Sequence, residues 1–125
     1  MEINELSGII PDAAIKVHSK PGPGLLGSVY RRALVHELTK RGISIEAEKP
    51  IPFKYEELVF DDGFRADIVV ERRIIIELKS VEKLAQVHSK QVLAYLRLSG
   101  LKLGLLINFG ESLLKDGYHR IVNGL

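Results

Sequence analysis

Hydrophobic positions recur with two different periods along the chain. Over residues 3–18 and again over 25–41, apolar side chains return every three or four positions, which predicts two amphipathic helices. Pro11 lies inside the first pattern, so we expect either a break in this helix or a second helix that begins near the proline. Two Pro-Gly pairs occupy residues 21–24 and predict a loop between the helical segments.

From residue 43 onward the period changes to two, which is typical of strands that are buried on one face. Extended runs are predicted at residues 43–45, 50–55, 58–60, 64–70 and 74–78. Residues 71–73 separate the last two runs and predict a tight hairpin between them.

Beyond the hairpin the pattern predicts one more helix and two more strands. Residues 82–99 show helical spacing and are apolar around much of the helix circumference, so we expect this helix to be well covered; Gly100 ends it. Residues 102–108 form a nearly continuous apolar run, which is typical of a strand buried on both faces. Residues 118–122 predict a short edge strand.

The order of elements up to the apolar run is therefore α-α-β-β-β-β-α-β, which is typical of an α/β fold with a mixed sheet flanked by helices. Because a helix links the strand at 74–78 to the strand at 103–107, we expect a right-handed parallel crossover between them. A length of 125 residues predicts a single domain that spans residues 1–125.

Composition excludes several kinds of site. The chain has no cysteine, which rules out disulfides, thiolate-bound zinc, iron–sulfur clusters and a thiol nucleophile. No apolar stretch is long enough to cross a membrane, and residues 1–5 lack the pattern of a signal peptide, so we expect a cytoplasmic protein without a membrane partner. The net charge of +2 is small, but residues 1–62 carry −2 and residues 63–125 carry +4, which weakly favours a polyanionic partner of the second half.

Charged residues in the predicted hairpin provide candidate chemistry. Strand alternation places Glu77 and Lys79 on one face with Ile75, and Asp67 on one face with Arg65 and Val69, opposite Ala66, Ile68 and Val70. Two interpretations are open. The charges could form Asp67–Arg65 and Glu77–Lys79 salt bridges on a solvated face. Alternatively, the two carboxylates could converge, and they would then repel each other unless a hard cation such as Mg²⁺ or Mn²⁺ lay between them.

Residues of the helix at 82–99 are candidates for contacts to such a site. Leu84, His88, Gln91, Tyr95 and Leu98 form a stripe that we expect to face inward, with Gln91 either a core glutamine or a site residue and His88 a structural hydrogen-bonding residue. Lys83, Lys90 and Arg97 recur every seven residues on the outer side, as a solvated face or as a ridge that follows phosphates. Tyr30 is expected in the core, and His18 is expected to cap the first helix.

These residues resemble a known superfamily. Residues 65–67 followed by 76–79 resemble the Asp…Glu-x-Lys motif of PD-(D/E)XK nucleases, and residues 91–95 resemble the Gln-x-x-x-Tyr element of their RecB-like branch. From about residue 5 to residue 122 the chain also resembles the small stand-alone GxxExxY proteins. The matching stretches are residues 17–18, 22–26, 28–30, 63–67, 77–80, 87–88 and 101–109.

The resemblance implies a restriction-endonuclease-like core and a metal-dependent nuclease that hydrolyses phosphodiester bonds, with DNA favoured over RNA. It implies that Asp67, Glu77 and the Leu78 carbonyl bind Mg²⁺ or Mn²⁺ and that Lys79 is catalytic with support from Gln91. The nucleic acid would contact four further residues, Tyr95, Lys83, Lys90 and Arg97.

One position departs from the family pattern. Gly27 stands where the GxxExxY motif, here Gly24 to Tyr30, has its glutamate. A first-helix acid commonly completes the metal site in this superfamily, so the alternative is a catalytically degenerate module that binds nucleic acid or a protein partner. The chain is also a candidate for homodimer formation.

Overall fold

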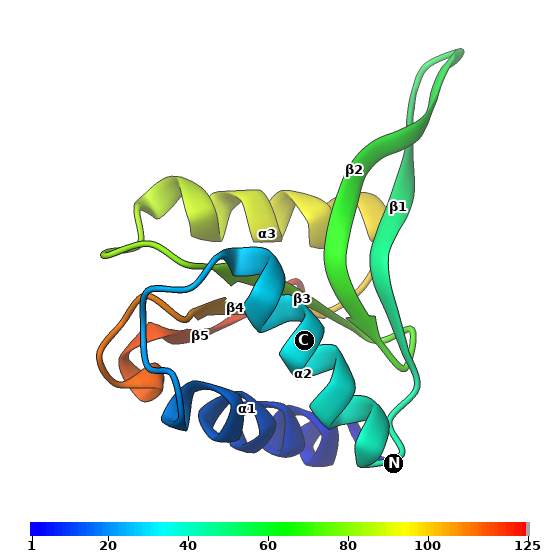
Figure 1. Cartoon of the computed structure of the whole chain (residues 1–125). Helices are drawn as coiled ribbons and strands as arrows, with labels where there is room; N and C mark the ends of the chain where they lie inside the picture. The colour runs from blue at the N-terminus through cyan, green and yellow to red at the C-terminus, as the bar shows by residue number, and fades with distance from the viewer. Residues whose placement is uncertain (125) are drawn as a thin grey trace.

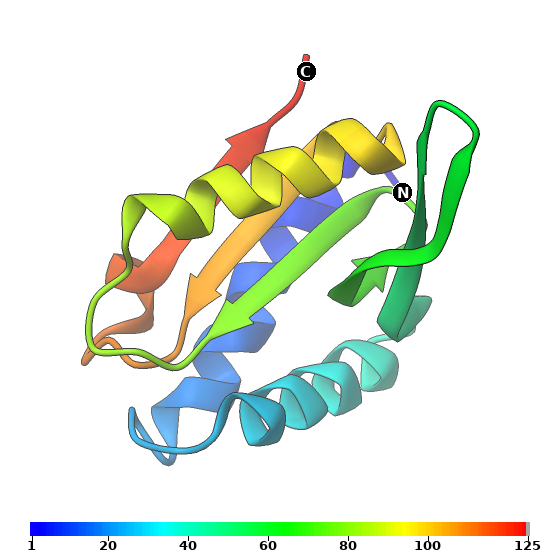
Figure 2. The same ribbon diagram turned by 90° about the horizontal axis from the view of Figure 1, so that it is seen from above.

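The fold, seen in a computed structural model that describes residues 1–124, is a five-stranded mixed sheet with helices on both faces (Figures 1 and 2). In chain order the elements are α1 (Ile3–Ser19), α2 (Gly27–Lys40), β1 (Ile45–Tyr55), β2 (Leu58–Val70), β3 (Ile74–Lys79), α3 (Gln86–Ser99), β4 (Leu103–Asn108), the 3₁₀ helix η1 (Leu114–Gly117) and β5 (Tyr118–Val122). The strand order is β1-β2-β3-β4-β5, and only β3 and β4 run parallel. The α/β class, the mixed sheet and the parallel crossover through α3 are confirmed.

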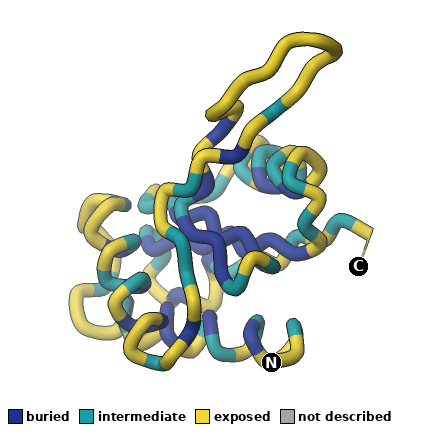
Figure 3. The backbone as a smooth tube through the Cα atoms, turned by 90° about the vertical axis from the view of Figure 1, so that its right-hand side faces the viewer, coloured by how far each residue is buried: buried dark blue, intermediate teal, exposed yellow. Residues whose placement is uncertain are grey.

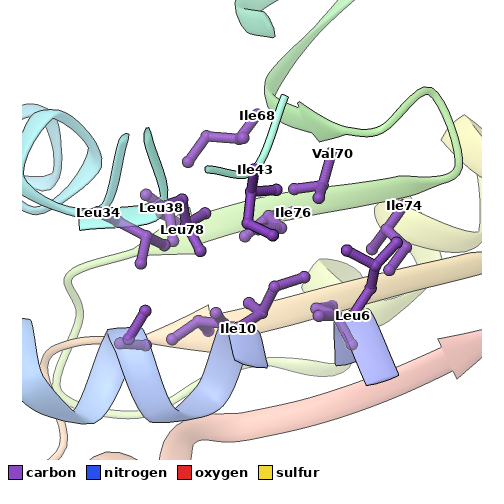
Figure 4. Close-up of a cluster of buried hydrophobic side chains, with 14 of the residues drawn as sticks. Leu6, Ile10, Leu34, Leu38, Ile43, Ile68, Val70, Ile74, Ile76 and Leu78 are labelled. Atoms are coloured by element: carbon purple, nitrogen blue, oxygen red, sulfur yellow. The ribbon is translucent and has the colours of Figure 1, made fainter. Parts of the chain in front are cut away.

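The sheet separates two hydrophobic cores. Helices α1 and α2 pack on one face, and α3 packs on the other. Strand β3 alternates between the two cores as expected: Ile74, Ile76 and Leu78 lie against α1 and α2 (Figure 4), whereas Ile75 lies against α3. Tyr30 is buried in the first core and stacks on Phe109, as its predicted core position requires. None of the helices in residues 1–124 has the length and hydrophobicity needed to span a bilayer.

Helix α1 continues through Pro11, so the predicted break is absent. A proline in a helix leaves the carbonyl four residues earlier without its N–H donor, and here that carbonyl belongs to Ser7. The hydroxyl of Tyr118 donates a hydrogen bond to the Ser7 carbonyl at 3.3 Å. The two residues are 111 positions apart, so the sequence near Pro11 does not reveal this compensation.

The five extended runs predicted before α3, counted as four strands in the predicted element order, form three strands. The segment at 43–45 merges with that at 50–55 into β1, and the segment at 58–60 merges with that at 64–70 into β2. The predicted hairpin at 71–73 is confirmed, and Glu71 and Arg72 have positive φ values of 52° and 56°, as in a two-residue type I′ turn.

The β1–β2 hairpin extends beyond the body of the protein as an arm, which comprises residues 53–62 (Figures 1 and 3). The register of the two strands shifts between Ile51 and Phe53, at the base of the arm. A Cβ atom at Gly63 would lie 2.5 Å from the Phe53 Cβ, so this close approach of the strands requires glycine.

Helix α3 begins at Gln86, four residues later than predicted. The Nδ1 atom of His88 accepts a hydrogen bond from the Ala85 N–H at 3.0 Å, and this local contact defines the helix start and the structural role of His88. The buried side chains of α3 are Val92 and Leu96, whereas Val87 and Leu98 are exposed. The expectations of a well-covered helix and of an inward stripe ending at Leu98 are therefore wrong.

Gly104 explains the orientation of α3. Its position in β4 lies directly beneath Val92 and Leu96, and a Cβ there would lie 2.6 Å from Val92 Cγ1. The missing side chain lets the helix lie close to the sheet, and this contact selects the face that becomes buried. The predicted strands at 102–108 and 118–122 are confirmed as β4 and β5.

The Gly104–Val92 contact predicts opposite effects for two glycine substitutions. Gly104→Ala should lower the free energy of unfolding by about 1–3 kcal/mol, because the methyl group overpacks the contact between α3 and β4. Gly8→Ala should raise it by up to about 1 kcal/mol, because Gly8 lies within α1 and its Cβ would meet open space. Urea unfolding of both variants tests this, and equal effects of the two substitutions would contradict the packing argument.

Candidate active site

Strands β2 and β3 separate at Asp67. Their paired residues run only from Val70–Ile74 to Ile68–Ile76, and beyond that point side chains replace the backbone ladder. The Asp67 Oδ2 atom accepts a hydrogen bond from the Leu78 N–H at 2.8 Å, and the Asp67 N–H donates to Glu77 Oε1 at 3.0 Å. The two carboxylates therefore bridge the opening between the strands and are held side by side.

The strand alternation predicted for β2 is wrong at one point. Ala66 was expected on the face of Ile68 and Val70, but it lies in the α3 core together with Val69, so the alternation changes between residues 66 and 69. The neighbouring strand is irregular at the same level. Glu48 lies between the partners of Ile68 and Ala66 and has a φ of 49°. This distortion allows the side chain of Asp67 to reach β3.

The interpretation as two solvated salt bridges is also wrong. Glu77 is only 4% exposed, and the Arg65 guanidinium donates to the Glu48 carbonyl. Within residues 1–124, no ion pair of 4.0 Å or less joins Asp67 to Arg65 or Glu77 to Lys79. The two acids are thus neighbours of each other and not partners of a nearby cationic side chain.

The pKa of Glu77 is raised to about 8, first by burial and then by the negative charge of Asp67. The hydrogen bond from the Asp67 backbone and the positive charge of Lys79 act in the opposite direction. At neutral pH the two carboxyl groups together therefore retain a proton. This proton relieves the electrostatic repulsion between Asp67 and Glu77, and a bound cation would relieve the same repulsion.

The donor set at this opening fits a hard divalent cation. Two carboxylates are present, and the Leu78 carbonyl faces the same side as the Leu78 N–H, because a strand residue directs both groups to one neighbour. Mg²⁺ commonly uses one or two carboxylates and completes its shell with water and substrate phosphates. Across residues 1–124 no group of three or more acidic or histidine side chains is arranged to hold a metal ion. Further ligands would therefore be backbone oxygens, water or substrate.

Three other predicted site residues differ in how far the structure connects them with the acidic pair. Lys79 is half-buried at the end of β3, and its charge acts on Glu77. Tyr95 on α3 is half-buried, and its pKa is raised by burial and then by the negative charges of Glu77 and Asp67. Gln91 is half-buried one turn earlier on α3, with no hydrogen bond to Asp67, Glu77 or Lys79 among the described residues.

Two residues near the site were missed by the sequence analysis. The ring of Phe64 stacks on that of Tyr95 with centroids 3.8 Å apart and thereby covers one side of the opening. Ser80 follows Lys79 directly and donates a hydrogen bond to the Leu25 carbonyl at 2.6 Å. This bond ties the end of β3 to the Pro-Gly loop before α2. Both residues lie in stretches that resemble the GxxExxY proteins, 63–67 and 77–80, but no local pattern indicated the stacking of Phe64 or the hydrogen bond of Ser80.

The Pro-Gly loop places the start of α2 near the end of β3. The Tyr30 hydroxyl donates to the Gly22 carbonyl and accepts from the Leu25 N–H at 3.1 Å, which fixes the loop. Gly27 is the first residue of α2, and a Cβ there would meet nothing within 4 Å. The position thus has room for the glutamate that the sequence comparison with GxxExxY proteins expects.

No hydrogen bond or ion pair joins the remaining candidates to the acidic pair within residues 1–124. The Nε2 atom of buried His18 hydrogen-bonds with the Glu111 carbonyl at 2.9 Å, so His18 ties α1 to the chain after β4 and does not cap the helix. Lys83, Lys90 and Arg97 are exposed, the first in the loop before α3 and the other two on the helix.

Comparisons with known proteins agree with this architecture. Residues 4–121 match the PD-(D/E)XK nuclease superfamily, so the chain belongs to that superfamily, and the restriction-endonuclease-like core is confirmed. No curated protein matches the sequence. The solved structure "Crystal structure of SSO0001" is similar in fold, with a TM-score of 0.56 and 21% sequence identity. The match covers 97% of this chain and 61% of that one, so the chain spans under two thirds of its length.

The raised pKa of Glu77 predicts how the stability of the metal-free protein depends on pH. Between about pH 4.5, where an unperturbed glutamate ionises, and pH 8, the folded state binds more protons than the unfolded state. Stability should therefore fall as pH rises through this window, by up to about 1.4 kcal/mol per pH unit, and then level off. Glu77→Gln keeps the acceptor for the Asp67 N–H and should remove this dependence.

Urea unfolding in EDTA at several pH values between 5 and 8.5 measures the effect. Glu82→Gln, at an exposed glutamate of the loop before α3, is the matched control and should follow the native protein. A loss of stability in Glu77→Gln that is the same at every pH would show that Glu77 is ionised in a structural ion pair.

Proposed function

We propose that this chain is a metal-dependent nuclease that hydrolyses phosphodiester bonds, with DNA favoured over RNA as substrate, and that it is a relative of the GxxExxY proteins. The observation that carries the proposal is the pair of Asp67 and Glu77, which is buried, hydrogen-bonded across separated strands and short of positive charge. Membership in the PD-(D/E)XK nuclease superfamily supports it.

Asp67, Glu77 and the Leu78 carbonyl would hold Mg²⁺ or Mn²⁺. The ion, when bound, supplies positive charge to a phosphoryl oxygen and lowers the pKa of a bound water molecule. Two backbone N–H groups of the chain hold the carboxylates in position for this chemistry. The hydrogen bond from the Leu78 N–H orients one oxygen of Asp67, and the bond from the Asp67 N–H orients one oxygen of Glu77, so both carboxylates are fixed before a ligand arrives.

Lys79 would stabilise the negative charge that develops on the attacked phosphate, since its ammonium lies on the same side of β3 as Glu77. Gln91 would support Lys79 or the attacking water from α3. Phe64 and Tyr95 form an aromatic stack beside the acids, and Tyr95 would contact the sugar or base next to the cleaved bond. Lys83, Lys90 and Arg97 would bind backbone phosphates along α3.

A second function is favoured by one observation. Gly27 supplies no carboxylate, and the acidic side chains of the site number only two. The chain would then be a degenerate nuclease fold that binds nucleic acid or a protein partner without cleaving it. The two functions differ in metal binding and in turnover.

Cleavage of labelled single- and double-stranded DNA and RNA with Mg²⁺ or Mn²⁺ tests the proposal. Lys79→Ala should reduce the cleavage rate by about 10²–10³-fold while metal binding by calorimetry persists, because a charge-stabilising group is lost and the carboxylates remain. Glu77→Gln should abolish both metal binding and cleavage. Lys20→Ala, at an exposed lysine after α1, is the matched control and should cleave as the native chain does. Binding of nucleic acid without metal-dependent cleavage would favour the degenerate module.

The open space at Gly27 gives a gain-of-function prediction. Gly27→Glu should tighten Mg²⁺ or Mn²⁺ binding and raise cleavage, because it adds an anionic group at the start of the helix beside the β3 end. Gly8→Glu makes the same chemical change at an unobstructed position of α1 and should alter neither property. Equal metal affinity of the native chain and Gly27→Glu, measured by calorimetry, would show that residue 27 does not reach the metal.

A further inference from the structure

The arm, residues 53–62, exposes several large apolar side chains to solvent. Phe53 and Phe60 stack on each other with centroids 5.8 Å apart and stiffen the hairpin. Around this pair, four large apolar side chains are exposed within six residues: Tyr55 (59%), Leu58 (60%), Val59 (62%) and Phe60 (47%). A cluster of this kind at the end of a projecting hairpin is typical of a surface that binds another protein.

The charge of the arm restricts the partner. The arm also carries four acids, Glu56, Glu57, Asp61 and Asp62, which lie beside its apolar residues, and a single cation, Lys54. Such a surface repels nucleic acid, because the phosphate backbone is itself negatively charged. The partner must therefore be a protein surface that offers apolar contacts together with positive charge.

A complementary surface exists on the same chain. A groove of about 620 Å³ lies between α2 and β1, and Val35 and Ala47 are the apolar residues of its lining. Three cationic side chains, Arg31, Arg32 and Lys40, line it together with one acid, Glu48, so the lining has a net positive charge. Arg31 is engaged by Glu48 at 3.5 Å and Lys40 lies 3.9 Å from Glu37, whereas Arg32 is exposed at the rim. The groove thus offers both properties that the arm requires of its partner, namely apolar contacts and positive charge.

The spacing of arm and groove suits a two-fold arrangement. Ala47, in the groove, and Glu56, which follows β1 at the arm tip, are nine positions apart, which corresponds to about 30 Å at about 3.3 Å per residue. A two-fold axis near Pro52, halfway along this distance, would bring the tip of each arm to the groove of the other copy. Both contacts then form at once and the assembly closes.

Backbone pairing between two β1 edges is disfavoured. Strand β1 is an edge of the sheet, but Pro50 and Pro52 remove two of its N–H donors near the middle of the strand. The contact between two copies would therefore depend on the side chains of the arm and not on an extended sheet.

We propose that the arm of one copy docks into the groove between α2 and β1 of a second copy, and that two such contacts form a closed homodimer. The native chain should therefore sediment at twice its mass of 14.0 kDa. The double substitution Glu56→Lys with Glu57→Lys on the arm should give monomers by placing positive charge against the groove. The double substitution Arg31→Glu with Arg32→Glu in the groove should do the same.

Mixing the two variants provides the decisive measurement. In a mixed pair the positive arm of one chain meets the negative groove of the other, while the native arm and the native groove also meet, so dimers should reappear on mixing. The control Glu2→Lys with Glu5→Lys, at exposed acids before and within the first turn of α1, should stay dimeric.

Three results would overturn the proposal. One is a native chain that remains monomeric at every concentration in sedimentation equilibrium. A second is a dimer that persists in both charge-reversed variants, which would place the interface elsewhere. The third is a pair of monomeric variants, each folded by circular dichroism, that stay monomeric when mixed, since reciprocal docking requires them to associate.

Discussion

The exchange of hydrogen bonds between Asp67 and β3 is the interaction on which the candidate site depends. In a regular ladder the Leu78 N–H would be bonded by a carbonyl of β2, and the two strands would stay close. Here the carboxylate of Asp67 takes the place of that carbonyl. The strands separate by the length of a side chain, and the space between them is lined by oxygen atoms.

The same separation connects the site to the rest of the fold. Strand β2 turns away from β3 at Asp67 and continues past Phe64 into the arm, so this one strand carries one acid of the pair, one ring of the aromatic stack and one side of the arm. At the other end, Ser80 ties β3 to the loop before α2. The site is therefore bounded by elements that are distant in sequence but fixed to one strand pair.

Local pattern predicted most of the helices and strands, because they depend on short-range properties, whereas the roles of the candidate site residues came from the resemblance to a known superfamily. Strand alternation placed Glu77 and Lys79 correctly on β3, a regular strand. It failed at Ala66, where a distortion shared with Glu48 changes the face. The expected helix break at Pro11 was wrong as well, because the Tyr118 hydroxyl donates a hydrogen bond to the Ser7 carbonyl from the far end of the chain. Long-range compensation and paired irregularities leave no periodic trace in a single sequence.

The electrostatics of the pair also give a physical reason for a glycine at residue 27. In the metal-free protein Asp67 and burial already raise the pKa of Glu77 to about 8. If a glutamate at residue 27 reached the opening, this third carboxylate would add repulsion that only a bound cation or another proton could relieve. A domain of this size has a small net stability, and each uncompensated buried charge takes a large share of it. With glycine at residue 27 the metal-free protein would avoid this repulsion, but the metal-bound protein would have one anionic ligand fewer. Residue 27 would thereby raise the stability without metal and lower the affinity for metal.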